Sequence, residues 1–245
     1  MSPIRALLES PLAWPLHPAA TRLSDFEGIP PVRAIEAALG SVAGVRFAPS
    51  APKPRRASRR VKLTPYDAAI AIEGTVPTRE NNLHDLMNAL VWASFPRSKR
   101  ALHARQHRLV SSAGAPRSGE AQSRTPEADT LAMLDEGGLL VVVEDRSAAE
   151  ATRVTRARDA EAAGELARAG RLRPVGFGHA LYQHLVQASG TALGMAVVLA
   201  QPGAEEAPLS DIDEILARRI EDPADFLHNS SFGSIPFSPS VWEKA

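Results

Sequence analysis

One segment in the first half of the chain, residues 83–95, is apolar almost all the way round when it is drawn as a helix. At about 100° per residue, its apolar side chains cover most of the circumference; they are Leu83, Leu86, Met87, Ala89, Leu90, Val91, Ala93 and Phe95. A helix of this kind is stable only when other elements cover it on every side. The segment therefore predicts a buried helix around which the rest of the chain folds.

The polar residues of this helix share one arc. They are His84, Asp85 and Asn88, and the same arc of roughly 100° contains Trp92. Buried polar groups need hydrogen-bond partners, so two interpretations are open. The three side chains either satisfy neighbouring helix ends and loops, or they line a pocket. In the second case we expect Trp92 at the floor of that pocket.

The positions of proline and glycine indicate where the other elements begin and end. We expect about six helices and two to four strands, in a helix-dominated α+β fold with a small β-sheet. The segments with helix signals are 30–39 with a stop at Gly40, 64–74, 83–95, a segment capped by Ser98, 125–138, 148–170 with a break at Gly164, a segment that begins near Gly178, and 210–222 with a Ser210 cap; not all of them need be separate helices. The expected strands cover 45–48, 139–143 and 193–200, and a short extended segment from 172 precedes the helix near Gly178. Three irregular segments complete the prediction: an N-terminal arm at 1–30, a mobile basic loop at 49–62 and a loop at 111–124.

Composition predicts one globular domain over residues 1–245. A hydrophobic fraction of 44% and a charged fraction of 23% are ordinary for a water-soluble protein with a single core. The longest apolar runs, at 137–143 and 193–200, are too short to cross a bilayer, and prolines interrupt the N-terminal segment. We therefore expect no membrane contact and a cytoplasmic location. Because the chain has no cysteine, any metal must be held by His, Asp, Glu or Asn.

The two halves of the chain carry opposite charge. Residues 1–124 have 18 Lys and Arg against 9 Asp and Glu, and residues 125–245 have 10 against 19. In one interpretation the halves attract each other inside the fold. In the other, a basic face binds a phosphate-bearing ligand beside an acidic surface.

Two further segments carry side chains that could bind a cation or take part in catalysis. Asp135 and Glu136 end the helix at 125–138, where the helix dipole disfavours carboxylates by about 0.3–1 kcal/mol each. This placement fits a cation that meets them, an arginine or a metal, although a solvated helix end would also tolerate it. His179 follows Gly178 at an expected helix start. Histidines from two segments and one carboxylate make a plausible set of ligands for a divalent metal.

The segment "PTRENNLHDLMNALVWASFPRSKRALHARQ" resembles the core of the bacterial Domain of Unknown Function 3025 family, which has the pattern Thr-Arg-x-Asn-x-His-Asp-x-x-Asn-Ala-x-x-Trp-x-x-Phe-Pro-x-x-Lys. The matching residues are Thr78, Arg79, His84, Asp85, Asn88, Ala89, Trp92, Phe95, Pro96 and Lys99. The chain departs from the pattern at His103, where the family has Asn. "SRTPEADTLAMLDEGG" and "GFGHALYQHL" are similar to two later family segments, so the resemblance spans residues 60–200. It implies a family but no activity.

Our leading hypothesis is a metal-assisted hydrolase that acts on a small phosphate-containing substrate. The residues predicted to carry it are Arg79, Asp85 and Asn88 for catalysis, His84, Asp85 and His179 for a divalent metal, and Lys99, Arg124, Asp135 and Trp92 for the substrate. The alternative is a non-catalytic binding or adaptor protein that contacts nucleic acid or another acidic partner through the basic segments 52–62 and 97–108. The chain lacks a Walker loop, a Gly-x-Ser-x-Gly elbow and a Gly-x-Gly-x-x-Gly fingerprint, which argues against the enzymes that use them. The sequence does not indicate an oligomeric state.

Overall fold

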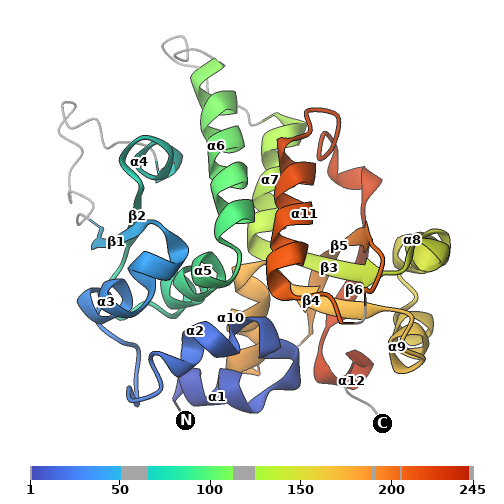
Figure 1. Cartoon of the computed structure of the whole chain (residues 1–245), viewed down its shortest axis with the longest axis horizontal. Helices are drawn as coiled ribbons and strands as arrows, with labels where there is room; N and C mark the ends of the chain where they lie inside the picture. The colour runs from blue at the N-terminus through green and yellow to red at the C-terminus, as the bar shows by residue number, and fades with distance from the viewer. Residues whose placement is uncertain (1, 51–65, 113–124, 189–190, 205, 243–245) are drawn as a thin grey trace.

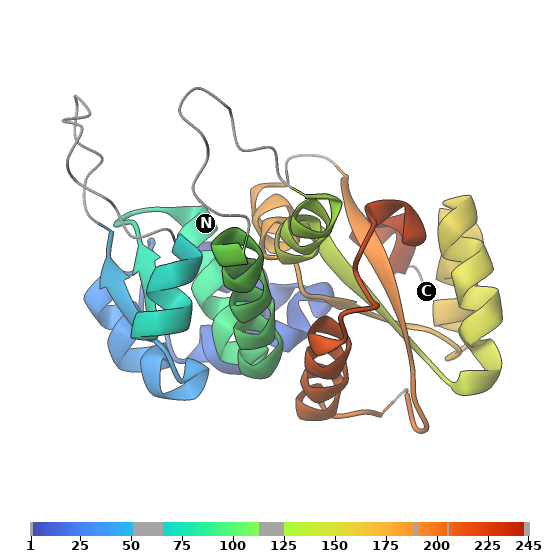
Figure 2. The same ribbon diagram turned by 90° about the horizontal axis from the view of Figure 1, so that it is seen from above.

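A computed structural model describes residues 2–50, 66–112, 125–188, 191–204 and 206–242. A four-stranded sheet lies on one side of the molecule and a group of helices on the other (Figures 1 and 2). The sheet has the order β4-β3-β5-β6, formed by Arg173–Gly176, Gly138–Val143, Ala192–Ala200 and Gly233–Phe237. The β3 and β5 strands are parallel, whereas β4 and β6 flank them in the antiparallel direction. All six residues of β3 are buried, as expected of a central strand covered on both faces.

A second, two-stranded sheet lies at the opposite side of the molecule. Its strands β1, Arg46–Pro49, and β2, Thr75–Thr78, are parallel, with Phe47 opposite Val76. The α4 helix, Tyr66–Glu73, precedes β2 in the chain and packs on it. The α3 helix, Val32–Ala43, packs against β1.

The α5 helix, Leu83–Ser94, is the buried helix that the sequence predicts. Asn82 caps its start, because its Oδ1 accepts a hydrogen bond of 3.0 Å from the backbone N–H of Asp85. Every residue from Leu86 to Ala93 is buried. The elements around it are η1, Pro11–Leu16, α2, His17–Thr21, α3, α6, Pro96–Ser112, and α10, His179–Gln187.

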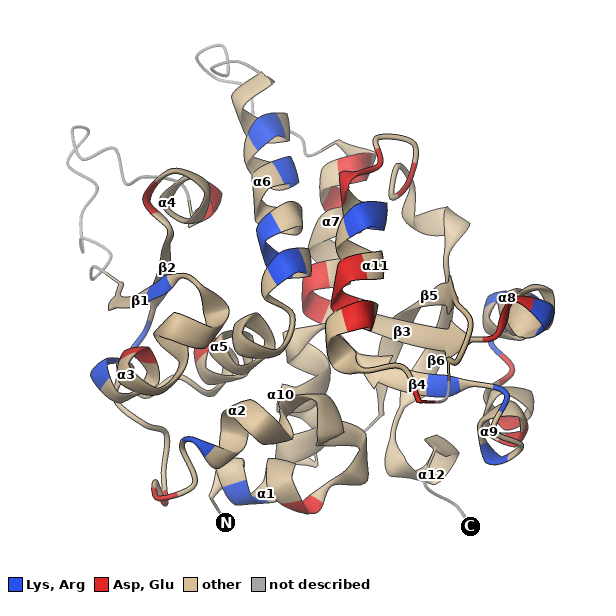
Figure 3. Cartoon of the chain, in the orientation of Figure 1, with Lys and Arg blue, Asp and Glu red and all other residues tan. Residues whose placement is uncertain are grey.

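The opposite charges of the two halves meet where α6 packs on α11, Leu209–Glu221 (Figure 3). Arg97 Nη1 donates to Glu214 Oε2 at 2.5 Å. The guanidinium of Arg105 is buried and donates to the carbonyls of Ile220, Asp222 and Asp225 at 2.7 to 2.8 Å, so that it closes the C-terminal end of α11. At the α6–α11 contact, the basic residues of the first half and the acidic residues of the second half therefore attract each other within the fold.

The remaining elements complete the shell around the sheet. They are α7, Pro126–Gly137, η2, Asp145–Ser147, α8, Ala148–Ala157, α9, Ala160–Arg168, η3, Asn229–Ser231, and α12, Pro239–Trp242. The α8, α9 and α12 elements lie at the sheet end of the molecule (Figure 1). Within the described ranges, no helix has the length and apolar character to span a membrane.

The N-terminal arm is not irregular, contrary to the prediction. Residues Pro3–Glu9 form α1, and η1 and α2 follow directly. Each of the three segments has proline in its first turn, where the missing N–H has no helical partner and proline favours the helix. Their apolar side chains, among them Ile4, Leu7 and Leu16, belong to the core.

Other differences concern where helices begin and end. The α3 helix passes Gly40 and ends at Gly44, which has φ 63°. The predicted break at Gly164 falls instead at Arg158, which has φ 58° at the end of α8, and Gly164 lies inside α9. Strands β2 and β6 were not predicted.

Two predicted caps and two predicted loops also need correction. Ser98 lies inside α6, whose first turn is capped from a distance by Asp213, and Ser210 lies inside α11, which Pro208 precedes. Residues 111 and 112 belong to α6, and the rest of the loop predicted at 111–124 lies outside the described residues. Most of the basic loop predicted at 49–62 lies outside them too.

Candidate functional site

A pocket of about 570 Å³ opens between α4, α5, α6, α7 and the start of α10. The polar residues that line it come from all five helices, from the turn before α5 and from the residue after β1; they are Ser50, Tyr66, Asp67, Arg79, His84, Asp85, Asn88, His103, Gln106, Asp135, Glu136 and His179. His84, Asp85 and Asn88 all face this pocket, as the shared arc on α5 predicts. The second interpretation of the polar arc, the lining of a pocket, therefore holds for all three residues, and Asp85 also satisfies the backbone N–H of Arg79, as the first interpretation predicts.

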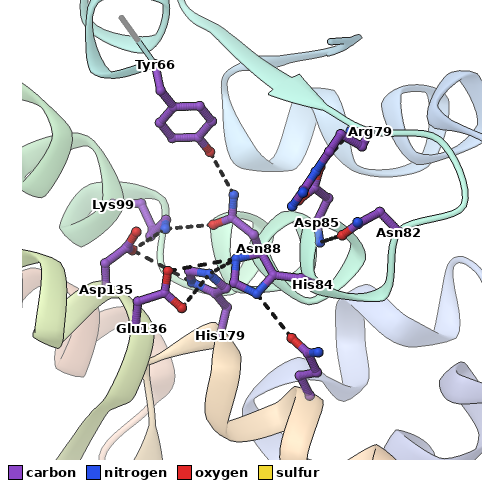
Figure 4. A network of polar contacts seen from close by, with 11 residues as sticks. Tyr66, Arg79, Asn82, His84, Asp85, Asn88, Lys99, Asp135, Glu136 and His179 are labelled. Atoms are coloured by element: carbon purple, nitrogen blue, oxygen red, sulfur yellow. Dashed lines mark hydrogen bonds and ion pairs between the residues drawn. The ribbon is translucent and has the colours of Figure 1, made fainter. Parts of the chain in front are cut away.

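Two imidazoles and a carboxylate meet at the base of the pocket (Figure 4). His84 Nε2 and His179 Nε2 are 2.9 Å apart, and the rings meet edge to face. The Glu136 carboxylate lies beside both, with Oε2 at 3.4 Å from His179 Nε2 and Oε1 at 3.8 Å from His84 Nε2. One ligand atom from each residue lies within 4.8 Å of the other two, a spacing at which one ion could contact all three.

Close packing of two glycines brings these residues together. The N–H of Gly178, just before α10, donates to the carbonyl of Gly138 at 2.8 Å. A Cβ at Gly178 would lie 2.4 Å from the backbone nitrogen of Gly138 and 2.5 Å from the carbonyl oxygen of Glu136. Only glycine permits this approach, and it places His179, the first residue of α10, against the end of α7.

The two imidazoles differ in environment. His84 Nδ1 lies 3.1 Å from Gln183 Oε1, so the ring donates there and its Nε2 is left to face the cluster. His179 is 3% exposed. Burial lowers the pKa of His179 to about 3, although the negative charge of Asp135 opposes the shift. For Glu136, burial raises the pKa, with the nearby His84 acting in the opposite direction.

An ion pair between the fully buried Lys99 and the largely buried Asp135 lies next to the cluster. Lys99 Nζ donates to Asp135 Oδ1 and, at 2.8 Å, to Asn88 Oδ1. Asn88 in turn donates to the hydroxyl of Tyr66 at 2.8 Å. Burial raises the pKa of Asp135, but the charges of Lys99 and then of His179 outweigh it and hold that pKa well below 3.8. The sequence leaves an arginine, a metal or a solvated helix end open for the carboxylates at the end of α7; the partner of Asp135 is instead a lysine.

Asp85 has a different partner from the one predicted. Its Oδ2 accepts hydrogen bonds from the backbone N–H and Nε of Arg79 at 2.6 and 3.0 Å, and its Oδ1 accepts from Nη2 at 2.7 Å. Both oxygens are thus engaged, and Asp85 is not part of the His84–His179 cluster. The carboxylate that occupies the predicted place of Asp85 is Glu136, one residue after Asp135.

The residues predicted to bind substrate are placed as follows. Asp135 lines the pocket but is held by Lys99, which is buried and not available to a ligand. Trp92 is fully buried and does not line the pocket, so its predicted place at the pocket floor is wrong; it stacks on His103 with ring centroids 5.4 Å apart. Arg124 lies outside the described residues. The sequence analysis missed Tyr66, Asp67 and Gln106 as pocket residues, because only tertiary contacts bring α4 and α6 to this wall.

Three comparisons with known proteins bear on identity. Residues 55–244 match the family described as "Protein of unknown function (DUF3025)". Neither the curated proteins nor the solved structures give a significant match.

Proposed function

The chain belongs to the DUF3025 family, whose description assigns no function, and we propose from the site alone that it is a metal-dependent hydrolase. The divalent ion would be held by His84 Nε2, His179 Nε2 and the carboxylate of Glu136. Two imidazoles with one carboxylate form a known catalytic donor set, which leaves coordination positions open for water and substrate.

The observation that carries the proposal is the 2.9 Å contact between the two Nε2 atoms. Two bare imidazole nitrogens at this distance repel each other through their lone pairs. The contact is stable only if the nitrogens share a proton or face a common cation. With a carboxylate oxygen at 3.4 Å and another at 3.8 Å, the cluster offers negative charge to that cation.

A bound divalent ion would act as a Lewis acid and lower the pKa of its water. The surrounding residues would supply the rest of the site. Gln183 fixes the ring of His84 by accepting from Nδ1, and the Lys99–Asp135 pair supports His179, whose Nδ1 lies 4.0 Å from Asp135 Oδ1. The hydroxyl of Tyr66 faces the pocket and can donate a hydrogen bond to a substrate atom, because it already accepts one from Asn88.

The phosphate part of the hypothesis receives less support than the metal part. It depended on Lys99, Arg79 and Arg124. Lys99 is neutralised by Asp135 and Arg79 by Asp85, while Arg124 lies outside the described residues. We therefore propose a hydrolytic reaction without a phosphate requirement.

The adaptor alternative depends on two basic segments, and several arginines of one of them, 97–108, are engaged within the fold. Arg97 and Arg105 of α6 are engaged by α11 and by the segment after it, and Arg100 donates to the carbonyl of Gly44 at 2.5 Å. The other basic segment, 52–62, lies outside the described residues. Among the described residues, no specific contact favours a nucleic-acid function over the metal site.

Metal analysis of the purified protein tests the proposal. We expect close to one equivalent of zinc or manganese, or uptake of one equivalent with micromolar or tighter affinity in a calorimetric titration. His84→Ala, His179→Ala and Glu136→Gln should each weaken binding by tenfold or more, since each removes one of three ligands. His228→Ala, at an exposed histidine, is the matched control and should bind like the wild type.

The hydrolytic part is tested with the loaded protein and two activated substrates, p-nitrophenyl acetate and p-nitrophenyl phosphate. Turnover above background, lost in His84→Ala and retained in His228→Ala, is expected for at least one of them. Failure to bind any divalent ion would overturn the site. No turnover of either ester by the metal-loaded protein would contradict the hydrolytic part of the proposal.

A further inference from the structure

The wall of the pocket formed by α4 and α6 carries a second polar group, formed by Asp67, His103 and Gln106. His103 Nδ1 lies 2.9 Å from Asp67 Oδ1. Gln106 lies three residues after His103 on α6, so the two side chains are neighbours on one helix face. All three residues line the same pocket as the histidine cluster.

The His103 ring is held in one orientation. Its side chain is 2% exposed, and the indole of Trp92 stacks on one face at an interplanar angle of 8°. The Tyr66 ring meets it edge to face, with centroids 5.6 Å apart. Because the ring cannot turn freely, the position of Nε2 is fixed by the packing.

Two hydrogen-bond acceptors of this group are buried without a partner among the described residues: His103 Nε2 and Gln106 Oε1. A carboxylate can only accept, so the hydrogen bond to Asp67 requires the proton on Nδ1. The neutral His103 ring then presents a bare Nε2. Buried polar atoms in native proteins nearly always have a partner, so two neighbouring exceptions that line one pocket point to a ligand.

The charges around the pocket indicate which ligand. Asp85 is balanced by Arg79, and Asp135 by Lys99. The carboxylates of Asp67 and Glu136 have no Lys or Arg partner in the described part of the chain. The lining therefore attracts hydrogen-bond donors and cations, and disfavours an anionic group at this wall.

We propose that His103 Nε2 and Gln106 Oε1 together bind a ligand nitrogen that carries two or more N–H bonds, as in a primary amine or a primary amide. Such a nitrogen can donate to both acceptors at once. The inference names a substrate class for the pocket of the proposed function, but it depends on the pocket and not on the metal.

The test uses the full-length protein in EDTA with three probes of similar size: butylammonium, butyramide and butyrate. The ¹⁵N NMR spectrum of the protein labelled at its histidines first reports the tautomer of His103. The His103 resonances are assigned as those that are missing from the spectrum of His103→Asn. We expect the proton on Nδ1. Butylammonium and butyramide should shift the His103 Nε2 resonance saturably, and butyrate should not.

Two variants test whether Gln106 Oε1 is one of the two acceptors that bind the ligand nitrogen. Gln106→Leu keeps the size of the side chain but removes an acceptor, so it should weaken both active probes about fivefold to tenfold. Gln187→Leu makes the same change at an exposed position of α10 and should have no effect. Circular dichroism checks that both variants fold.

Any one of four outcomes would overturn the inference. They are a proton on His103 Nε2, butyrate binding as tightly as the other probes, no saturable shift with any probe, and equal affinity in Gln106→Leu and the wild type. Because the titrations contain EDTA, none of these outcomes depends on metal binding. A failed metal titration would overturn the proposed hydrolase and leave this result standing.

Discussion

The amino group of Lys99 contacts the carboxylate of Asp135 at the end of α7, and the lysine side chain has no exposed surface. Lys99 belongs to α6, so this pair ties two helices together behind the pocket. Its hydrogen bond to Asn88 adds α5 as a third helix. The buried pair therefore fixes how three walls of the site meet.

Removal of one partner of this pair should destabilise the protein strongly. We expect Lys99→Met to lower the free energy of unfolding by about 3–5 kcal/mol, since it leaves a buried carboxylate without its cation. The double variant Lys99→Met/Asp135→Leu removes both charges and should recover most of that loss. Urea denaturation of the wild type and both variants measures the difference; a double variant no more stable than Lys99→Met would contradict the account.

The same pair should contribute to acid unfolding. Because the pKa of Asp135 in the folded protein lies below its usual 3.8, the pair contributes its full stability above pH 3.8 and loses it as the pH falls below that value. The wild type should therefore lose more unfolding free energy than Lys99→Met/Asp135→Leu when the pH is lowered from 5 to about 3. Denaturation in EDTA at several pH values tests this; parallel curves for the two proteins would count against it.

Asp213 of α11 caps the first turn of α6 from a distance. Its carboxylate accepts from the backbone N–H groups of Arg97 and Ser98 at 3.0 and 2.8 Å. Asp213→Ala should lower the unfolding free energy by about 1–3 kcal/mol, because two helix-start donors lose their acceptor. Asp211→Ala, on the exposed side of the same helix, is the control, and thermal melts should show a much smaller change for it.

The close approach of Gly178 to Gly138 should not tolerate a side chain. Gly178→Ala would place a Cβ 2.4 Å from the nitrogen of Gly138, so the start of α10 must move. We expect weaker metal binding by His84, His179 and Glu136 together with a lower melting temperature. Gly28→Ala, where a Cβ meets nothing within 4 Å, should leave both unchanged.

Much of the fold follows from local features of the sequence. The buried α5 helix, the ends of α7 and the start of α10 were all predicted, because periodicity, capping residues and glycine act over a few residues. The N-terminal segment was predicted wrongly because its prolines were interpreted as helix breakers. In the structure Pro3, Pro11 and Pro18 occupy first turns, where proline is favourable, and Pro15 lies inside the short 3-10 helix η1.

The candidate site also has one part that the sequence determined and another that only the tertiary structure decided. The sequence determined that His84, Asp85 and Asn88 share one face of a buried helix, since that follows from 100° per residue alone. Only the tertiary structure decided which partner each polar side chain takes. His84 meets His179 across 95 residues of chain, and Asp135 and Glu136, adjacent in sequence, point to different partners, Lys99 and the histidine pair. Such choices depend on distances of a few ångströms between side chains far apart in sequence, which no local pattern encodes.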